Sequence, residues 1–366
     1  MDFNLSDLQR MLLDTAERYL AERFTLEHRR ALRDTADGLD TEAWSTFAEL
    51  GWLALAIPEA QGGLGGTMAD IAVLGAALGY RCVALPFTSS AVIAPMILAE
   101  SDAPQGGLLQ AIAEGISRVA LAHDEPDERY NYSAGRRTML TDSGSGWTVT
   151  GQKMLVLDAP SATHLIVSAG GDDDFTLTLV PADAEGISSS PYPLLNGARA
   201  ADIVLDEVAG GIPLARGRKA RTLLANALDY GRIADAAQMV GSMEADLALC
   251  SAYLKERQQF GQPIGKFQAL QHIMADMFVA THQARSILYS AIAAAEADEA
   301  TRSRAVSLAR INIAEAHQIV ARQAIQLHGG YGITDEYEVS HHYRHQIVLE
   351  KLYGDVDFHE RRLAAD

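Results

Sequence analysis

The chain has 366 residues, more than one hydrophobic core usually serves, so two or three domains are expected. Apolar residues make up 48% and charged residues 21%, as in soluble globular proteins. The formal net charge is -18, and such a surface repels nucleic-acid phosphates and anionic lipid, so neither is expected as a partner.

The sequence predicts a cytoplasmic protein without a membrane span. No apolar run reaches the roughly 18 residues that cross a bilayer, and the first residues show no signal core. Cys82 and Cys250 lie in apolar surroundings, so two buried thiols are expected rather than a disulfide.

Residues 1–118 show helical patterns. Ser6 and Gln9 have the spacing of a capping box, and apolar residues recur behind them at helical intervals. Further helices are predicted over residues 41–50, ended by Gly51, and over 68–78. The glycines at 62, 63, 65 and 66 predict a break between these two helices.

Residues 119–218 change to short alternating segments, at 147–150, 164–168 and 175–180. Turn residues at 144–146 and 170–174 separate them, so a small antiparallel β domain is expected. The run Asp172–Asp174 is interpreted as a solvated hairpin loop, because no calcium-loop spacing follows it.

Residues 219–366 are predicted to be helical again, with long alanine-rich stretches over 222–254, 266–297 and 300–328. Long antiparallel helices with short connections indicate a helix bundle. The expected architecture is therefore an N-terminal all-α domain, a central antiparallel β domain and a C-terminal four-helix-bundle domain.

A polar segment connects the first two long helices of this bundle. It contains Arg257, Gln259, Phe260 and Gln268. A guanidinium gives bidentate donors to phosphate, and glutamine pairs a donor and an acceptor toward a base edge. The alternative is an ordinary interhelical turn with a surface arginine, which composition alone favours.

A second candidate segment follows the third long helix, with Gln326, Gly329 and Gly330. Two glycines would let a ligand approach the backbone, and they would equally serve as a C-cap of the helix. Both interpretations can hold together.

Other sequence patterns are weaker evidence for a functional site. His341, His342 and His345 include a pair four residues apart, a zinc spacing, but no third ligand follows, so a solvated helix face is expected. The glycines at 62–66 lack the strand and helix of a dinucleotide fingerprint, and no nucleophile elbow occurs.

Taken together, these segments resemble the acyl-CoA dehydrogenase family. The resemblance rests on Arg257-x-Gln259-Phe260-Gly261, Phe267-Gln268, Ala275–Met277, Gln326–Gly330, Gly51–Gly66 and Trp147–Lys153. It spans essentially the whole chain in order, and the chain is similar to the small subunits of pimeloyl-CoA-type and steroid-side-chain-type dehydrogenases. The resemblance implies FAD as cofactor, with Arg257, Gln259, Phe260, Gln268, Gln326, Gly329 and Gly330 holding its ADP half across a subunit interface.

In that family a glutamate removes the substrate's α-proton. By resemblance its two known positions correspond to Gly354 and Gly231, and glycine cannot abstract a proton. Asp355 is a weak substitute, expected instead to be a cap or surface carboxylate.

The family's flavin-binding segments are also altered. The loop that usually holds a Gly-Ser step corresponds to residues 123–130, where Glu128 and Arg129 replace that step. The strand that usually lies against the flavin ring corresponds to Leu155–Leu157, and a threonine contact corresponds to Val356.

The resemblance therefore implies a subunit that clamps the FAD of a related catalytic partner, in an α2β2 heterotetramer. Its substrate would be an acyl-CoA with a steroid side chain or dicarboxylic acyl group, and its electron acceptor an electron-transfer flavoprotein. The alternatives are a self-sufficient homotetramer with a displaced carboxylate base, and a flavin-free structural or regulatory subunit.

Overall fold

The computed structural model describes residues 4–126, 128–132, 134–142, 144 and 146–365. They form two compact units, each assembled from separate stretches of the chain. One unit takes the described residues of Met1–Ala31, Met68–Val83 and Arg232–Asp366, and the other takes Leu32–Thr67 and Ala84–Gly231. Helix α2 (Leu26–Arg33) and the 40-residue helix α7 (Gly217–Glu256) each run across this division.

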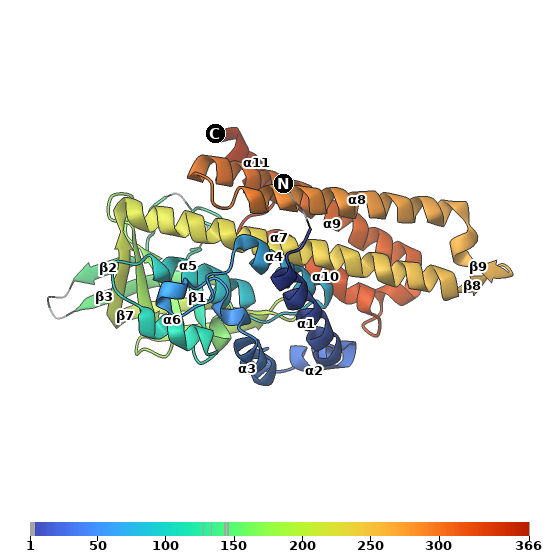
Figure 1. Ribbon diagram of the computed structural model, residues 1–366. Coiled ribbons are helices and arrows are strands. Elements are labelled where there is room, and N and C mark those ends of the chain that lie inside the picture. The colour runs from blue at the N-terminus through green and yellow to red at the C-terminus, as the bar shows by residue number, and fades with distance from the viewer. Residues whose placement is uncertain (1–3, 127, 133, 143, 145, 366) are drawn as a thin grey trace. The chain divides into compact units, whose positions relative to one another are not determined.

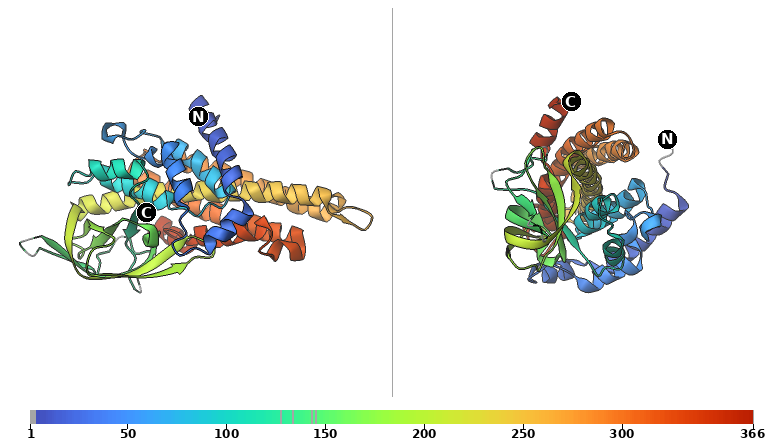
Figure 2. Two further views of the ribbon diagram at one scale, coloured as in Figure 1. Left: turned by 90° about the horizontal axis from the view of Figure 1, so that it is seen from below. Right: turned by 90° about the vertical axis from the view of Figure 1, so that its left-hand side faces the viewer.

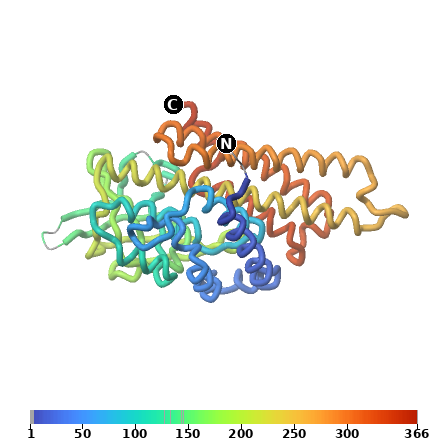
Figure 3. The backbone as a smooth tube through the Cα atoms, viewed as in Figure 1, coloured from blue at the N-terminus to red at the C-terminus, as the bar shows by residue number. Residues whose placement is uncertain are grey.

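The first unit is a helix bundle, and the long helices predicted near 222–254, 266–297 and 300–328 are confirmed with slightly different ends. Figure 3 shows α7 leading through a short hairpin into α8, which runs back along it. Besides the end of α7, this unit contains α1 (Asp7–Arg23), α4 (Met68–Tyr80), β8 (Gln258–Gln259), β9 (Gln262–Pro263), η5 (Ile264–Lys266), α8 (Gln268–Ala293), α9 (Glu299–His328), η6 (Gly329–Ile333), α10 (Glu338–Lys351) and α11 (Val356–Ala365).

Glycines allow α4 to pack directly on the backbone of α7. A Cβ at Gly79 would lie 1.9 Å from the carbonyl oxygen of Gln238, and one at Gly241 would lie 1.9 Å from that of Ala76. Helix α8 is tied to α7 by an ion pair between Arg285 and Glu244. The right-hand view of Figure 2 shows α7 and α8 nearly end-on.

The predicted capping box is confirmed at the start of α1. The Ser6 side chain accepts a hydrogen bond from the Gln9 backbone N–H, and the Gln9 side chain accepts one from the Ser6 N–H, at 3.1 and 3.0 Å. These bonds satisfy two of the donors that a helix start leaves unpaired.

The second unit places short helices beside a sheet. Its helical elements are α3 (Thr41–Glu49), η1 (Trp52–Ala54), η2 (Glu59–Gln61), the π-helical turn η3 (Phe87–Ile93), α5 (Ala94–Ala99), α6 (Gly106–Ala113) and η4 (Ala159–Ser161). Gly51 follows α3 with φ 75°, as predicted for a helix stop. The buried rings of Trp44, Phe47 and Trp52 pack in series, with centroids 6.2 and 4.7 Å apart.

The sheet of this unit has the strand order β1-β4-β5-β7-β3-β2, with β6 also paired to β7. Figure 1 labels β1, β2, β3 and β7 of this sheet. The predicted strands are confirmed, but the sheet is mixed, because β1 and β4 pair in parallel. The segment between them is long enough for such a crossover. The strands are β1 (Val119–Ala122), β2 (Met139–Asp142), β3 (Trp147–Leu157), β4 (His164–Ala169), β5 (Thr176–Pro181), β6 (Ile187–Pro193) and β7 (Arg199–Arg216).

The loop predictions in this unit agree with the structure where it is described. Asp172–Asp174 form an exposed turn between β4 and β5. Ser145, in the predicted turn before β3, lies outside the described residues. Among the described helices, none combines the length and apolarity needed to cross a bilayer.

The prediction of a solvated histidine face on α10 is wrong. His342 and His345 are buried and His341 is half-buried, because this face of α10 packs inside the bundle. The Nδ1 atom of His342 lies 2.9 Å from Ser242 Oγ and 3.2 Å from Cys82 Sγ. No metal-binding group occurs among the described residues.

The prediction for the two cysteines is confirmed. Cys82 and Cys250 are free and buried. Burial raises the pKa of Cys82 to about 12, so its thiol stays protonated and unreactive near neutral pH.

Candidate functional site

The segment after α7 forms a tight hairpin. Gln258 pairs with Pro263 and Gln259 with Gln262, which leaves Phe260 and Gly261 as the two turn residues. Their φ angles of 54° and 77° are both left-handed, as a two-residue hairpin turn of type I′ requires. The turn holds the Phe260 side chain 89% exposed.

The turn after α9 leaves its backbone open. Gly329 ends the helix at φ 59°, and its N–H donates to the carbonyls of Gln326 and Ile325, so the C-cap interpretation is confirmed. A Cβ placed on Gly329 or on Gly330 would meet no atom within 4 Å. A ligand could therefore contact this backbone directly.

The hairpin and the glycine turn lie at the same end of the bundle (Figure 1), and aromatic rings contact one another between them. Tyr253 lies one helical turn before Arg257, and its ring centroid is 4.4 Å from that of His328 and 6.4 Å from that of Tyr331. Sequence reasoning missed Tyr253 and Tyr331. Their positions in the sequence, next to the two candidate segments, could have identified them.

The polar side chains at this end are available to a ligand. Arg257, Gln259, Gln268 and Gln326 are all exposed. Among the described residues, none forms a hydrogen bond or ion pair with their side chains. A free guanidinium, free amides and an open glycine backbone fit the diphosphate and base of a nucleotide. We call Arg257, Gln259, Phe260, Gln268, Gln326, Gly329 and Gly330 the clamp.

Gly354 lies in a closed turn before α11. Its φ is 127°, a conformation that side-chain-bearing residues rarely adopt. A Cβ there would lie 2.4 Å from Phe358 Cδ1 and 3.0 Å from His359 Nε2. The adjacent Asp355 carboxylate accepts a hydrogen bond from the Phe358 N–H at 3.0 Å and so caps α11.

Cations surround the Gly354 turn. Arg232 Nε donates to the Tyr353 carbonyl at 2.8 Å, and Arg310 Nη2 donates to the Leu352 carbonyl at 3.0 Å. Burial, helped by these two arginines, lowers the pKa of His359, so its ring is neutral. The turn is therefore surrounded by fixed cations, and its carboxylate, Asp355, is used to cap α11.

The space beside Gly231, in the second unit, is also filled by a neighbouring side chain. A Cβ there would lie 2.6 Å from Cδ1 and 2.8 Å from Cγ1 of Ile93. The space that a longer side chain would need is already filled.

The loop after β1 holds a buried carboxylate, Glu125, that is satisfied by neighbouring groups. The buried Glu125 carboxylate accepts hydrogen bonds from Lys153 Nζ at 2.7 Å, Thr138 Oγ1 at 2.6 Å and the Arg137 N–H at 2.8 Å. Burial alone would raise the pKa of Glu125, but Lys153 and these hydrogen bonds outweigh it and hold the pKa at about 2. Burial lowers the pKa of Lys153 to about 8, against the opposing carboxylate.

The side chains of Glu128 and Arg129 interact with other residues of the same loop. Glu128 lies 3.6 Å from Arg136 and 3.4 Å from Arg137, and Arg129 lies 4.5 Å over the Tyr130 ring. Asp127, in the middle of this loop, lies outside the described residues. These side chains are therefore held by the loop itself.

The strand segment Leu155–Leu157 is irregular. Leu155 has φ 49° at a bulge of β3, and its N–H donates to the Asp202 carboxylate at 3.0 Å. It offers neither an aromatic ring nor a hydroxyl.

Comparisons with known proteins agree across the chain. Residues 6–115 match the family model described as acyl-CoA dehydrogenase, N-terminal domain, and residues 221–366 match acyl-CoA dehydrogenase, C-terminal domain. Acyl-CoA dehydrogenase IpdE2 of Mycolicibacterium smegmatis is 28% identical over 366 residues, covering 99% of both chains. Acyl-CoA dehydrogenase FadE12 of Mycobacterium tuberculosis is 30% identical over 82% of this chain and 81% of its own.

Solved structures give the same fold. A variant of the Tcur3481-Tcur3483 steroid acyl-CoA dehydrogenase (ACAD) has a TM-score of 0.89 and 29% identity, covering 98% of this chain and 97% of that one. The ChsE4-ChsE5 complex of Mycobacterium tuberculosis has a TM-score of 0.90 and 24% identity, covering 100% and 98%.

Proposed function

The chain belongs to the acyl-CoA dehydrogenase family, and we propose that it is the non-catalytic subunit of a heteromeric, FAD-dependent acyl-CoA dehydrogenase. In this role the clamp binds the ADP half of an FAD whose flavin is held by a related catalytic subunit. FAD supplies the acceptor for the hydride that leaves the β-carbon of the acyl group. An electron-transfer flavoprotein then takes up the electrons.

The observation that carries this proposal is the closure of both base positions. Dehydrogenation needs a carboxylate within hydrogen-bond reach of the α-proton. Gly354 and Gly231 have no side chain, and Phe358 and Ile93 occupy the space where one would begin. Asp355 is committed to capping α11. The base is therefore expected from another chain.

The clamp and the loop around Glu125 differ in how their polar groups are used, and this difference supports nucleotide binding by the clamp. Clamp side chains are exposed and have no hydrogen-bond partner among the described residues, as expected for groups that bind a ligand. The loop around Glu125 instead uses its polar groups internally. Arg257 would donate to the diphosphate, the glutamines would bind polar edges, and Gly329–Gly330 would admit the ligand to the backbone.

The assembly proposal is an α2β2 heterotetramer built through the bundle. Apolar side chains are exposed on α8 and α9, with Phe278 at 54%, Val279 at 51% and Ile319 at 50%. Such exposed apolar surface is typical of interfaces. The name of the Tcur3481-Tcur3483 steroid ACAD, at 29% identity, also supports an assembly of two different chains and a steroid-type acyl-CoA as substrate.

The first test is co-purification of the tagged chain from its native host, with FAD quantified per chain. We expect a second, related subunit in equal amount and FAD in the complex, whereas the chain alone has neither FAD nor turnover. A lone preparation with stoichiometric FAD that turns over an acyl-CoA would support the self-sufficient homotetramer instead.

Arg257→Ala separates the clamp from a purely structural role. Losing charge-assisted hydrogen bonds to a diphosphate should weaken FAD retention of the complex about 10- to 100-fold. The matched control is Arg304→Ala, another exposed arginine, about 33 Å along α9 from Gln326 at about 1.5 Å per residue. Equal FAD content in both variants would favour the flavin-free subunit.

A further inference from the structure

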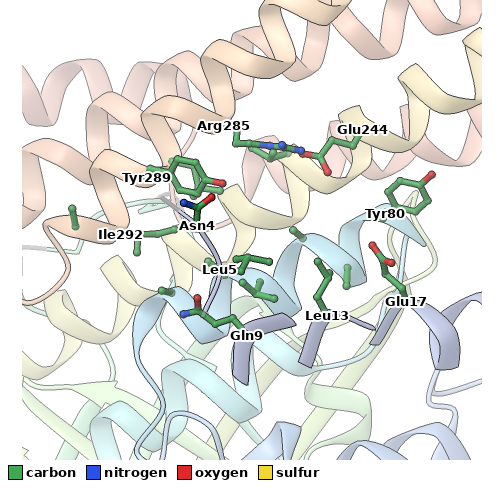
Figure 4. Close-up of a pocket in the computed structure, with 18 of the residues that line it drawn as sticks. Asn4, Leu5, Gln9, Leu13, Glu17, Tyr80, Glu244, Arg285, Tyr289 and Ile292 are labelled. Atoms are coloured by element: carbon green, nitrogen blue, oxygen red, sulfur yellow. The ribbon is translucent and has the colours of Figure 1, made fainter. Parts of the chain in front are cut away.

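A pocket of about 780 Å³ opens in the first unit among α1, α4, α7 and α8 (Figure 4). Pockets of this volume commonly hold small organic ligands. Among the described residues that line it, none belongs to the clamp or to the Gly354 turn. The pocket is thus separate from the proposed cofactor site.

The pocket arises from the choice of residues on α4. Its glycines bring α4 onto the backbone of α7, while the lining positions 69, 72, 76 and 77 carry only alanine. Apolar side chains of the other helices complete the wall, among them Leu5, Leu13, Leu288 and Ile292. The pocket opens to solvent, and its wall is mostly apolar, so it is suited to an occupant with an apolar body.

One end of the pocket has free polar groups. Tyr80 lies within electrostatic reach of Glu17 and Glu244, and Figure 4 shows these three side chains gathered there. Glu244 is paired with Arg285, but the Glu17 carboxylate and the Tyr80 hydroxyl have no hydrogen-bond partner among the described residues. Burial, helped by the two carboxylates and opposed by Arg81, raises the pKa of Tyr80, so its hydroxyl keeps its proton and can donate.

The other polar groups in the wall are already engaged. The Gln9 amide donates to Asp70 at 2.9 Å, and Asn4 and Tyr289 interact with other residues of the chain. In the wall, two carboxylates (Glu17 and Glu244) are balanced by two arginines (Arg81 and Arg285). This balance favours neither an anion nor a cation.

We propose that this pocket binds a neutral, largely apolar alcohol. Its hydroxyl would accept a hydrogen bond from Tyr80 and donate one to Glu17, while its hydrocarbon body fills the space beside the α4 alanines. With two carboxylates and two arginines in the wall, neither an anionic nor a cationic head gains a net attraction, whereas a hydroxyl matches the Tyr80 donor and the Glu17 acceptor.

Three probes with the same tail test the head group: 1-dodecanol, dodecanoate and dodecylammonium. Binding is measured by isothermal titration calorimetry on the full-length chain and on the co-purified complex. We expect one saturable site for dodecanol on both samples, with the two ions at least about 10-fold weaker. Preference for either ion, or binding to the lone chain only, would overturn the proposal.

Two variants with matched controls test the location. Tyr80→Phe should weaken dodecanol binding about 5-fold through one lost hydrogen bond, whereas Tyr343→Phe, on α10 and outside the pocket, should not.

Ala76→Phe should abolish dodecanol binding by filling the pocket, whereas Ala364→Phe on α11 should leave it unchanged. Unaltered binding in both pocket variants would show that the site lies elsewhere. These readouts are binding constants, so their failure would leave the proposed function untouched.

Discussion

Asp246 is a fully buried carboxyl in the C-terminal half of α7. Neither of its carboxyl oxygens has a hydrogen-bond partner among the described residues. Burial raises its pKa well above the usual range, so the group is protonated near neutral pH. A buried polar group without a partner costs about 1–3 kcal/mol of folding free energy.

Asp246→Leu should therefore stabilise the chain, because leucine has nearly the same shape and no polar atoms. The expected gain at pH 7 is about 1–3 kcal/mol in the free energy of unfolding. The raised folded-state pKa makes the contribution of Asp246 itself most favourable below the unfolded pKa and less favourable as pH rises, so the gain from the substitution should grow from pH 4 to pH 8. Urea unfolding at several pH values measures it.

The control for this substitution is Asp14→Leu, at an exposed position of α1. Its effect should stay within about 0.5 kcal/mol and should not depend on pH in this way. A destabilised or pH-independent Asp246→Leu variant would mean that the carboxyl has a stabilising partner.

The two glycines at the family's base positions show what residues alone can and cannot predict. The absence of a carboxylate at Gly354 and Gly231 follows from the resemblance and the sequence. That Phe358 and Ile93 fill these spaces does not, because the first contact depends on the backbone conformation of Gly354 and the second on the packing of η3 against α7. The sequence therefore predicted the missing group but not that its space is closed.

At the scale of elements, the α4–α7 contact depends on glycines with no room for a methyl group. A Cβ on Gly79 would meet the backbone oxygen of Gln238, which cannot move aside without shifting the helix. We expect Gly79→Ala to lower the free energy of unfolding by about 1–3 kcal/mol through overpacking. Alanine's better helix propensity, about 1 kcal/mol, would offset only part of this loss.

Gly107→Ala in α6 is the matched control, because a Cβ there meets nothing within 4 Å. It should raise stability by up to about 1 kcal/mol. Thermal unfolding midpoints of the two variants should therefore move in opposite directions. The same direction for both would argue against backbone contact between α4 and α7.

Sequence periodicity located the long helices correctly but predicted solvent exposure for the α10 histidine face, which is wrong. Alanine-rich repeats mark one apolar face whatever the partner, so α7, α8 and α9 could be located from sequence. Histidine counts as polar in such a pattern, yet His342 and His345 are buried as neutral rings. Their neutrality is set chiefly by burial inside the bundle, where His342 contacts Ser242 of α7 and Cys82 just after α4, and no local pattern contains this packing.

At the scale of the whole molecule, the stability of the bundle unit should depend on buried histidines. His317, His342 and His359 have pKa values lowered chiefly by burial, and burial lowers that of His345 to about 3. Above pH 6.5 these rings are neutral in both the folded and the unfolded chain. Below it, only the unfolded chain takes up the protons, so stability must fall as pH falls.

Each of these histidines contributes about 1.4 kcal/mol of lost stability per pH unit once its unfolded form titrates. These four histidines give no slope from pH 7 to 8 and a steep fall in the urea midpoint from pH 6 to 5, which the opposite contribution of Asp246, at most one proton, only partly offsets. His317→Leu should reduce the slope by about one proton, because both ring nitrogens of this buried residue lack a hydrogen-bond partner among the described residues. His272→Leu, at an exposed position of α8, should leave the slope unchanged. Constant stability down to pH 5 would mean that the folded chain can protonate these rings, which requires water or a counter-charge inside the bundle.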